Sequence, residues 1–275
     1  MDQEKKKRLK KILYFSLIGV LALVFIISAV YIANYLIDSS VQNSEYNELA
    51  QLVQSIKDQQ SGSTDSTVSS GGSPNATSGE DSTSAILPEY QAIYEMNNDL
   101  VGWITIPDTK IDYPVMQTPN KPDYYLNHNF NKDWSEWGCI YARETCDINT
   151  PSDNITLYGH HMADGSMFAQ LDKFKSSTFY KAHQTFTFDT LYEHHTYQII
   201  AVFKTSAIVG QGFAYHLFDY ADSEEEFNEF ISTVKSLQYY ETGITAEYGD
   251  MLLTLSTCEY TLEEGRFVVV AKRIS

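Results

Sequence analysis

The hydrophobic positions near the start of the chain form one unbroken run. The segment "ILYFSLIGVLALVFIISAVYIA" begins at Ile12 and extends for about 22 residues without a charge, directly after a tail that holds six lysine and arginine residues. A helix of that length rises about 33 Å, enough to cross a bilayer. A cleaved signal peptide has a shorter apolar run, of about 7–15 residues, so the pattern favours an uncleaved transmembrane anchor over residues 12–37. The basic tail, residues 1–11, is then expected in the cytoplasm and the rest of the chain outside it.

Two polar patterns follow the expected anchor. Residues 41–60 carry apolar side chains at helical spacing, which predicts a short juxtamembrane helix. In residues 61–85, Ser, Thr and Gly fill 17 of the 25 positions, so this stretch cannot bury a core and is typical of a flexible stalk. Residues 38–85 are therefore expected to link the anchor to a folded domain at residues 86–275.

The pattern of the last 190 or so residues changes to short strands with few helices. Pro88 stands at a plausible first helical position. In residues 222–238, Ser223 and Glu226 have the spacing of a capping box ahead of an apolar helical stripe, which predicts a structural helix. Segments rich in aromatic and β-branched residues predict strands at 102–107, 138–143, 155–160, 185–190, 196–207, 251–259 and 266–274. The fold class is therefore mainly β with helices (α+β), and the length suits one core.

Charge and cysteine content exclude some classes of function. The formal net charge is −17, and it becomes about −21 without the basic tail, because the remainder keeps 34 of 36 acidic but only 13 of 19 basic residues. A nucleic-acid partner is not expected, since phosphate binding needs clustered Lys and Arg. Three cysteines, Cys139, Cys146 and Cys258, are too few for a disulfide scaffold. Cys139 and Cys146 either form a disulfide or are two buried free thiols, and we expect free thiols.

Cys258 ends a predicted strand, "MLLTLSTCE", among small hydroxyl residues. It is either a packed small hydrophobe or a nucleophile, and a nucleophile needs a neighbouring base or cation. His160 and His161 follow the predicted strand that ends at Gly159, so a loop displays two imidazoles that can exchange protons near neutral pH. The alternative is a solvated turn. No cysteine or histidine cluster with ligand spacing accompanies them, so no metal is expected.

Arg266 begins the last predicted strand, eight residues after Cys258. If the two strands are antiparallel neighbours, the guanidinium returns close to the thiol, where it is able to stabilise an oxyanion. The alternative is a surface ion pair with Glu263 or Glu264. A second histidine pair, His194 and His195, falls between two predicted strands and is expected at a hairpin turn.

Taken together, "TLSTC" followed by a nearby arginine, "YGHHM" about a hundred residues upstream and the N-terminal anchor resemble the sortases, Gram-positive cysteine transpeptidases, and class B in particular. The resemblance covers about residues 86–275. It implies a closed β-barrel with N-terminal helices and a long helix before the cysteine strand. It also implies catalytic roles for Cys258 as nucleophile, His160 as general acid and base, and Arg266 as oxyanion stabiliser. Substrate contacts are implied for Ser256, Glu259 and Leu126.

The resemblance implies that the reaction needs no cofactor, and it implies three kinds of partner. These are surface proteins with a C-terminal sorting signal, an amine acceptor from a peptidoglycan cross-bridge or a pilin, and membrane lipid around the anchor. The expected location is the Gram-positive cell membrane, with a single pass and an extracellular catalytic domain. Two alternatives stay open: a hydrolase that passes the acyl group to water with the same residues, and an exported binding module in which Cys258 is only packed.

Overall fold

The computed structural model describes residues 3–62 and 85–275. The chain divides into two compact units, Met1–Glu45 and Tyr46–Ser275. The second of these units contains the barrel. Most of the expected stalk lies outside the described residues.

Helix α1 is continuous from Gln3 to Gly62. The expected anchor and the expected juxtamembrane helix are thus parts of one helix, because residues 38–60 contain neither proline nor glycine to interrupt it. Among the described residues it is the one helix long and apolar enough to cross a membrane. In its last turns Tyr46, Leu49 and Val53 are buried on one face of the helix.

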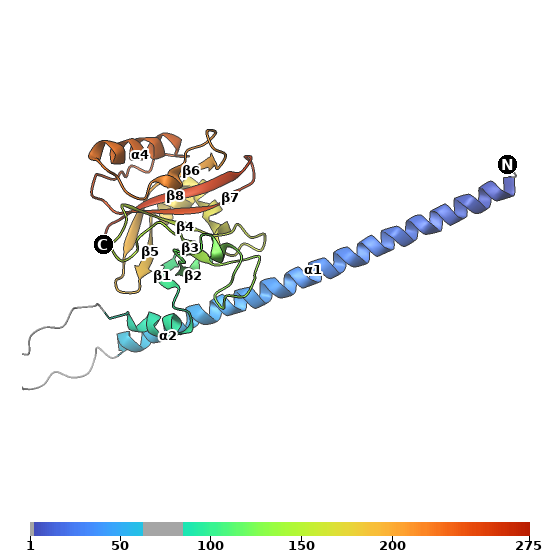
Figure 1. Cartoon of the computed structure of the whole chain (residues 1–275), viewed down its shortest axis with the longest axis horizontal. Coiled ribbons are helices and arrows are strands. Elements are labelled where there is room, and N and C mark those ends of the chain that lie inside the picture. Colours follow the sequence, from blue (N-terminus) through green and yellow to red (C-terminus); the bar gives the residue numbers. More distant parts are fainter. Residues whose placement is uncertain (1–2, 63–84) are drawn as a thin grey trace, which may run out of the picture. The chain divides into compact units, whose positions relative to one another are not determined.

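Eight strands close into a barrel in the order β1-β2-β3-β4-β7-β8-β6-β5 (Figure 1). Two neighbouring pairs, β2 with β3 and β4 with β7, are parallel, and the other pairs are antiparallel. The strands are β1 (Leu100–Thr105), β2 (Asp112–Met116), β3 (Ile140–Ala142), β4 (Asn154–Tyr158), β5 (Thr185–Thr190), β6 (Thr196–Ser206), β7 (Leu252–Glu259) and β8 (Gly265–Arg273). The predicted α+β class and closed barrel are confirmed.

Helices cover the barrel and fill its connections. The remaining α-helices are α2 (Pro88–Met96), α3 (Ser177–Ala182) and α4 (Glu224–Leu237), and the 3-10 helices are η2 (Tyr124–Leu126), η3 (Phe168–Lys175) and η4 (Tyr215–Leu217). The Ser223 hydroxyl accepts a hydrogen bond from the Glu226 amide at 3.2 Å, as the capping motif predicts. The apolar stripe of α4 packs in one core cluster with side chains of β6 and β8. Figure 1 shows the α4 ribbon on the side of the barrel where β6 and β8 lie. This is the structural helix expected before the cysteine strand.

Candidate active site

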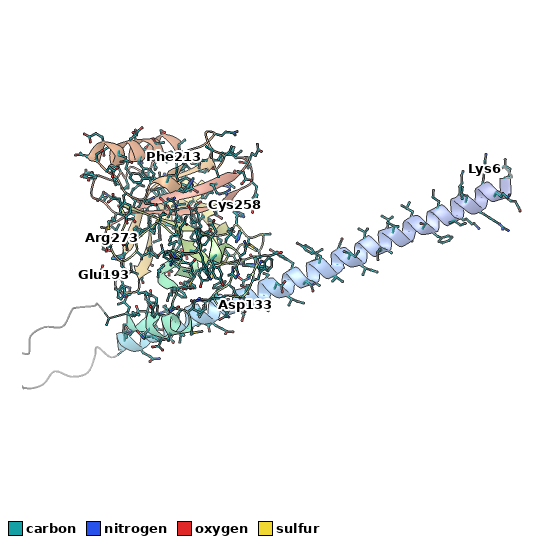
Figure 2. The ribbon with its side chains drawn as sticks, in the orientation of Figure 1. Lys6, Asp133, Glu193, Phe213, Cys258 and Arg273 are labelled. Atoms are coloured by element: carbon teal, nitrogen blue, oxygen red, sulfur yellow. The ribbon has the colours of Figure 1, made fainter. Side chains whose placement is uncertain are left out.

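Cys258 and Arg266 face each other on the neighbouring strands β7 and β8. They are register partners in the antiparallel pair β7–β8, so the predicted return of the arginine to the cysteine is confirmed. Figure 2 shows Cys258 on β7, and its side chain is only partly buried. The Arg266 guanidinium donates to the carbonyl of Gly265 at 2.9 Å and lies 3.8 Å from the exposed Glu264 carboxylate. Both partners are local, so the side chain is tethered at the strand end beside the thiol.

His160 enters the same site from the end of β4. The preceding Gly159 amide donates to the carbonyl of Ser256 on β7 at 3.2 Å, which extends the parallel pairing past the strand. A side chain at Gly159 would lie 2.4 Å from Ile140 and 2.8 Å from the Phe168 ring, so only glycine fits this crossing. The Nε2 of His160 is 2.8 Å from the backbone carbonyl oxygen of Leu126. Since a carbonyl only accepts, Nε2 carries the proton, and Nδ1 is the nitrogen left to exchange one.

His161 turns to a different surface. Its Nε2 lies 3.2 Å from the Asp172 carboxylate, and its ring meets the Tyr260 ring edge to face at 5.3 Å. Its carbonyl accepts a hydrogen bond of 3.1 Å from the Tyr260 hydroxyl. The choice of His160 over His161 as the site histidine therefore agrees with the geometry.

One cavity of about 550 Å³ joins the three residues. Its walls come from the ends of β3, β4, β7 and β8 and from the loops that contain η2 and η4. The lining includes Cys258, His160, Arg266, Leu126, Ser256 and Leu217. A thiol, an imidazole and a guanidinium on one cavity can supply the nucleophile, the acid–base group and the oxyanion donor of acyl transfer through a cysteine.

The three residues expected to contact substrate have different surroundings. Leu126 lines the cavity, and its carbonyl also holds the His160 ring. Ser256 is 1% exposed, and its hydroxyl shares a hydrogen bond of 2.5 Å with the buried Tyr215 hydroxyl. The Glu259 carboxylate is 5% exposed and accepts hydrogen bonds of 2.8–2.9 Å from Thr261. Desolvation opposes its ionisation, but these bonds, with Lys175 and Lys204 nearby, keep its pKa below the usual value.

Sequence reasoning missed an ion pair that fixes the η4 wall of the cavity. One guanidinium nitrogen of Arg143 contacts both carboxylate oxygens of Asp219, at 2.9 and 3.0 Å, and also donates to the carbonyl of His216. The Thr145 hydroxyl donates to the same carboxylate at 2.5 Å. Burial, with Arg143 and Arg266 nearby, lowers the pKa of His216, so its imidazole is neutral at neutral pH. Arginine and aspartate 76 residues apart give no local pattern that would reveal this contact.

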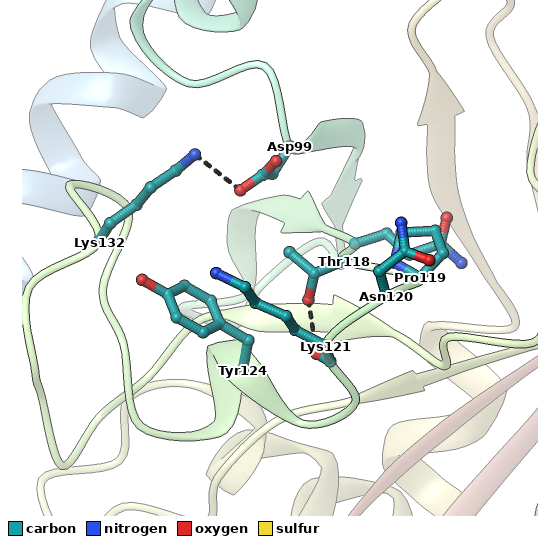
Figure 3. Close-up of a pocket in the computed structure, with 8 residues that line it drawn as sticks. Asp99, Thr118, Pro119, Asn120, Lys121, Tyr124 and Lys132 are labelled. Atoms are coloured by element: carbon teal, nitrogen blue, oxygen red, sulfur yellow. Dashed lines mark hydrogen bonds and ion pairs between the residues drawn. The ribbon is translucent and has the colours of Figure 1, made fainter.

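The loop that carries Leu126 is fixed on its outer side as well. Lys132 forms an ion pair of 2.8 Å with Asp99, and the Tyr125 hydroxyl donates to the same carboxylate at 2.8 Å. A hollow of about 280 Å³ lies here, with Lys121 and Tyr124 on its wall (Figure 3). Its lining shares no residue with the cavity at Cys258. The contacts to Asp99 hold the loop from outside.

The other two cysteines are buried thiols, as expected. Burial raises the pKa of Cys146 to about 12. The turn between β5 and β6 carries His194 and His195, in agreement with the predicted hairpin. In residues 3–62 and 85–275, no group of three or more His, Cys, Asp or Glu side chains is placed to hold a metal ion.

Comparison with known proteins gives consistent matches. A family model described as "Sortase domain" matches residues 104–274. Sortase B of Listeria monocytogenes is 33% identical over 192 residues, 69% of this chain and 76% of that protein. Sortase B of Staphylococcus aureus is 30% identical over 191 residues, with the same coverage.

Solved structures of the same class share the fold. The S. aureus sortase B–substrate complex superposes with a TM-score of 0.72 at 24% identity, over 87% of this chain and 99% of that one. Sortase B from B. anthracis in complex with AAEK1 gives a TM-score of 0.67 at 28% identity, over the same shares.

Proposed function

Because the chain belongs to the sortase family, we propose that it is a membrane-anchored cysteine transpeptidase that acts on C-terminal sorting signals. The observation that carries the proposal is the single cavity lined by Cys258, His160 and Arg266. The apolar part of α1 is compatible with an anchor and, with the basic tail before it, supports a cytoplasmic N-terminus and an extracellular barrel. The domain limits proposed are a basic tail at 1–11, an anchor at 12–37 and a linker that ends by residue 85.

In the first half-reaction the Cys258 thiolate attacks the carbonyl carbon of the scissile peptide bond. Negative charge develops on the carbonyl oxygen, and Arg266 stabilises it. Nδ1 of His160, which has taken the proton of the thiol, returns it to the leaving amine as the C–N bond breaks. The products are a thioester on Cys258 and the released C-terminal peptide.

In the second half-reaction an amine attacks the thioester. His160 accepts the proton of that amine, an amide forms, and the Cys258 thiolate leaves. The acceptor is an amino group of a peptidoglycan cross-bridge or of a pilin, and the donor is a surface protein that carries a sorting signal. A sortase B has been crystallised in complex with triglycine, which supports an amine-bearing peptide as acceptor here. Ser256, Glu259 and Leu126 are proposed to shape the substrate side of the site.

The test uses the full chain in detergent micelles, with a library of fluorogenic peptides that fix Thr before the scissile bond and with triglycine as acceptor. Mass spectrometry should detect a thioester on Cys258 and an amide product that contains triglycine. Cys258→Ala and His160→Ala should each abolish product. His161→Ala is the matched control, since that ring faces Asp172 instead of the cavity, and it should keep most of the activity.

Two results would redirect the assignment. Cleavage that yields only the free acid, even with excess triglycine, would identify a hydrolase with the same residues. A chain that cleaves no library peptide, and whose Cys258 resists iodoacetamide as fully as the buried Cys146, would favour the binding module.

A further inference from the structure

The orientation of His160 depends on a loop remote from it in sequence. The His160 Nε2–H donates to the Leu126 carbonyl at 2.8 Å, and Leu126 ends η2 in the long connection between β2 and β3. If the Leu126 carbonyl moves, the His160 ring that is hydrogen-bonded to it rotates as well. Whatever fixes the backbone at Leu126 therefore fixes which way Nδ1 points.

Gly138 packs directly on this backbone. It has a φ of +57°, and a side chain there would lie 2.4 Å from the carbonyl oxygens of both Tyr125 and Leu126. The next amide, that of Cys139, donates to the Tyr125 carbonyl at 2.9 Å. The peptides on either side of residue 138 thus form the support beneath the oxygen that holds His160.

The end of helix α1 fixes that support. The Tyr46 hydroxyl donates to the Gly138 carbonyl at 2.6 Å, and Tyr46 is 3% exposed. The Tyr46 ring also meets the Tyr113 ring edge to face at 5.4 Å. The Tyr113 hydroxyl accepts a hydrogen bond of 3.2 Å from the Met167 amide, and Met167 lies in the loop that follows His160. Tyr46 therefore supports both the acceptor of the His160 ring and the loop that carries the ring.

We propose that Tyr46 is a positioning residue for His160, so that the part of α1 that belongs to the barrel unit is a functional part of the active site. Tyr46 touches no reacting atom and acts through Gly138, Leu126 and Tyr113. The proposal rests on the proposed function only for the kinetic readout. A truncated chain that begins near residue 86 lacks this contact.

The test is Tyr46→Phe in the full chain in detergent micelles, with the library peptide and triglycine described above. Phenylalanine keeps the ring against Tyr113 and removes the hydroxyl from Gly138. We expect kcat to fall about 5- to 100-fold with KM changed less than about twofold, since small misplacement of a catalytic group acts on the chemical step. The matched control is Tyr90→Phe, which removes another buried hydroxyl, one that is bonded to Asp189 on β5 at 2.6 Å and not to the Gly138 carbonyl, and should leave kcat unchanged.

A second readout needs no turnover. Long-range ¹H–¹⁵N spectra of the imidazole of His160, assigned with His160→Gln, should show the Nε2–H tautomer in the wild-type chain and in Tyr90→Phe. Tyr46→Phe and Gly138→Ala should shift the resonances towards a mixture of tautomers. Wild-type spectra and wild-type kcat in Tyr46→Phe would overturn the positioning role. Inactive wild-type protein with the expected spectral change would overturn the proposed function and keep the positioning role.

Discussion

The ion pair between Arg143 and Asp219 gives the sharpest test of how the cavity wall is held. The substitution is Asp219→Asn, which keeps the shape of the side chain and removes its charge. The side chains of the pair are 16% and 13% exposed, so most of the water around both charges is already displaced. After substitution, the Arg143 guanidinium keeps the His216 carbonyl and loses its counter-charge.

The magnitude follows from these exposures. Removing one partner of a fully buried pair costs about 3–5 kcal/mol, whereas an exposed pair contributes about 0–1 kcal/mol. The Arg143–Asp219 pair lies nearer the buried limit, so the free energy of unfolding should fall by about 2–3 kcal/mol. For a unit of this size that is a decrease in Tm of about 5–10 °C. Because η4 lines the cavity, kcat/KM should also fall.

The assay is urea unfolding of the full chain in detergent micelles, followed by tryptophan fluorescence, because all three tryptophans lie in the barrel unit. A double-mutant cycle with Arg143→Met should give a coupling energy of about 1–2 kcal/mol. Lys132→Met is the control, because that ion pair with Asp99 is 43% and 26% exposed and should contribute at most about 1 kcal/mol. A loss below about 0.5 kcal/mol for Asp219→Asn, or a coupling energy near zero, would refute the reasoning.

Three further outcomes follow from the structure. Arg266→Ala should lower kcat about 10²- to 10³-fold while the urea midpoint stays near that of the wild type. A clear fall in the urea midpoint together with the loss of kcat would contradict an oxyanion role. Ser256→Ala should lower the free energy of unfolding by about 1–3 kcal/mol, because it leaves the buried Tyr215 hydroxyl without its partner; an unchanged midpoint with a raised KM would instead indicate direct substrate contact. Burial lowers the pKa of His195 and His216, so each imidazole binds a proton more readily in the unfolded chain than in the folded one. The folded state is therefore favoured above pH about 6.5, and it loses stability as the pH falls below that value. Replacing both with Gln should make the urea midpoint change less between pH 7 and 5.5 than it does in the wild type. An unchanged dependence of the midpoint on pH would exclude these two histidines as its cause.

Local pattern was sufficient for the parts of the fold that depend on neighbours in sequence. The α4 helix followed from its capping box and apolar stripe, and the pairing of Cys258 with Arg266 followed from two strands joined by a short loop. Strand β2 was missed because Pro114 interrupts its pattern, and proline is disfavoured inside strands. The pairing of β2 with β3 involves only Val115 and Met116, so Pro114 interrupts no pairing on that side of the strand.

Contacts between segments that are distant in sequence could not be predicted from local patterns. Arg143 and Asp219 are ordinary charged residues until the barrel brings β3 and η4 together. Tyr46 belongs to a helix whose apolar spacing was visible, but the pattern did not say that its buried face packs with the barrel unit. The surroundings of Ser256 and Glu259 were not predicted, because the bond of Ser256 to Tyr215 and that of Glu259 to Thr261 are contacts that a motif does not encode.

The central claim, acyl transfer through Cys258, is tested most directly by trapping the acyl-enzyme. The full chain would be mixed with a sorting-signal peptide from the library, quenched in acid, digested and analysed by mass spectrometry. The account predicts a hydroxylamine-sensitive adduct on Cys258 that disappears when triglycine is added and is replaced by an amide product. An adduct on another residue, or amide product from Cys258→Ala, would contradict it.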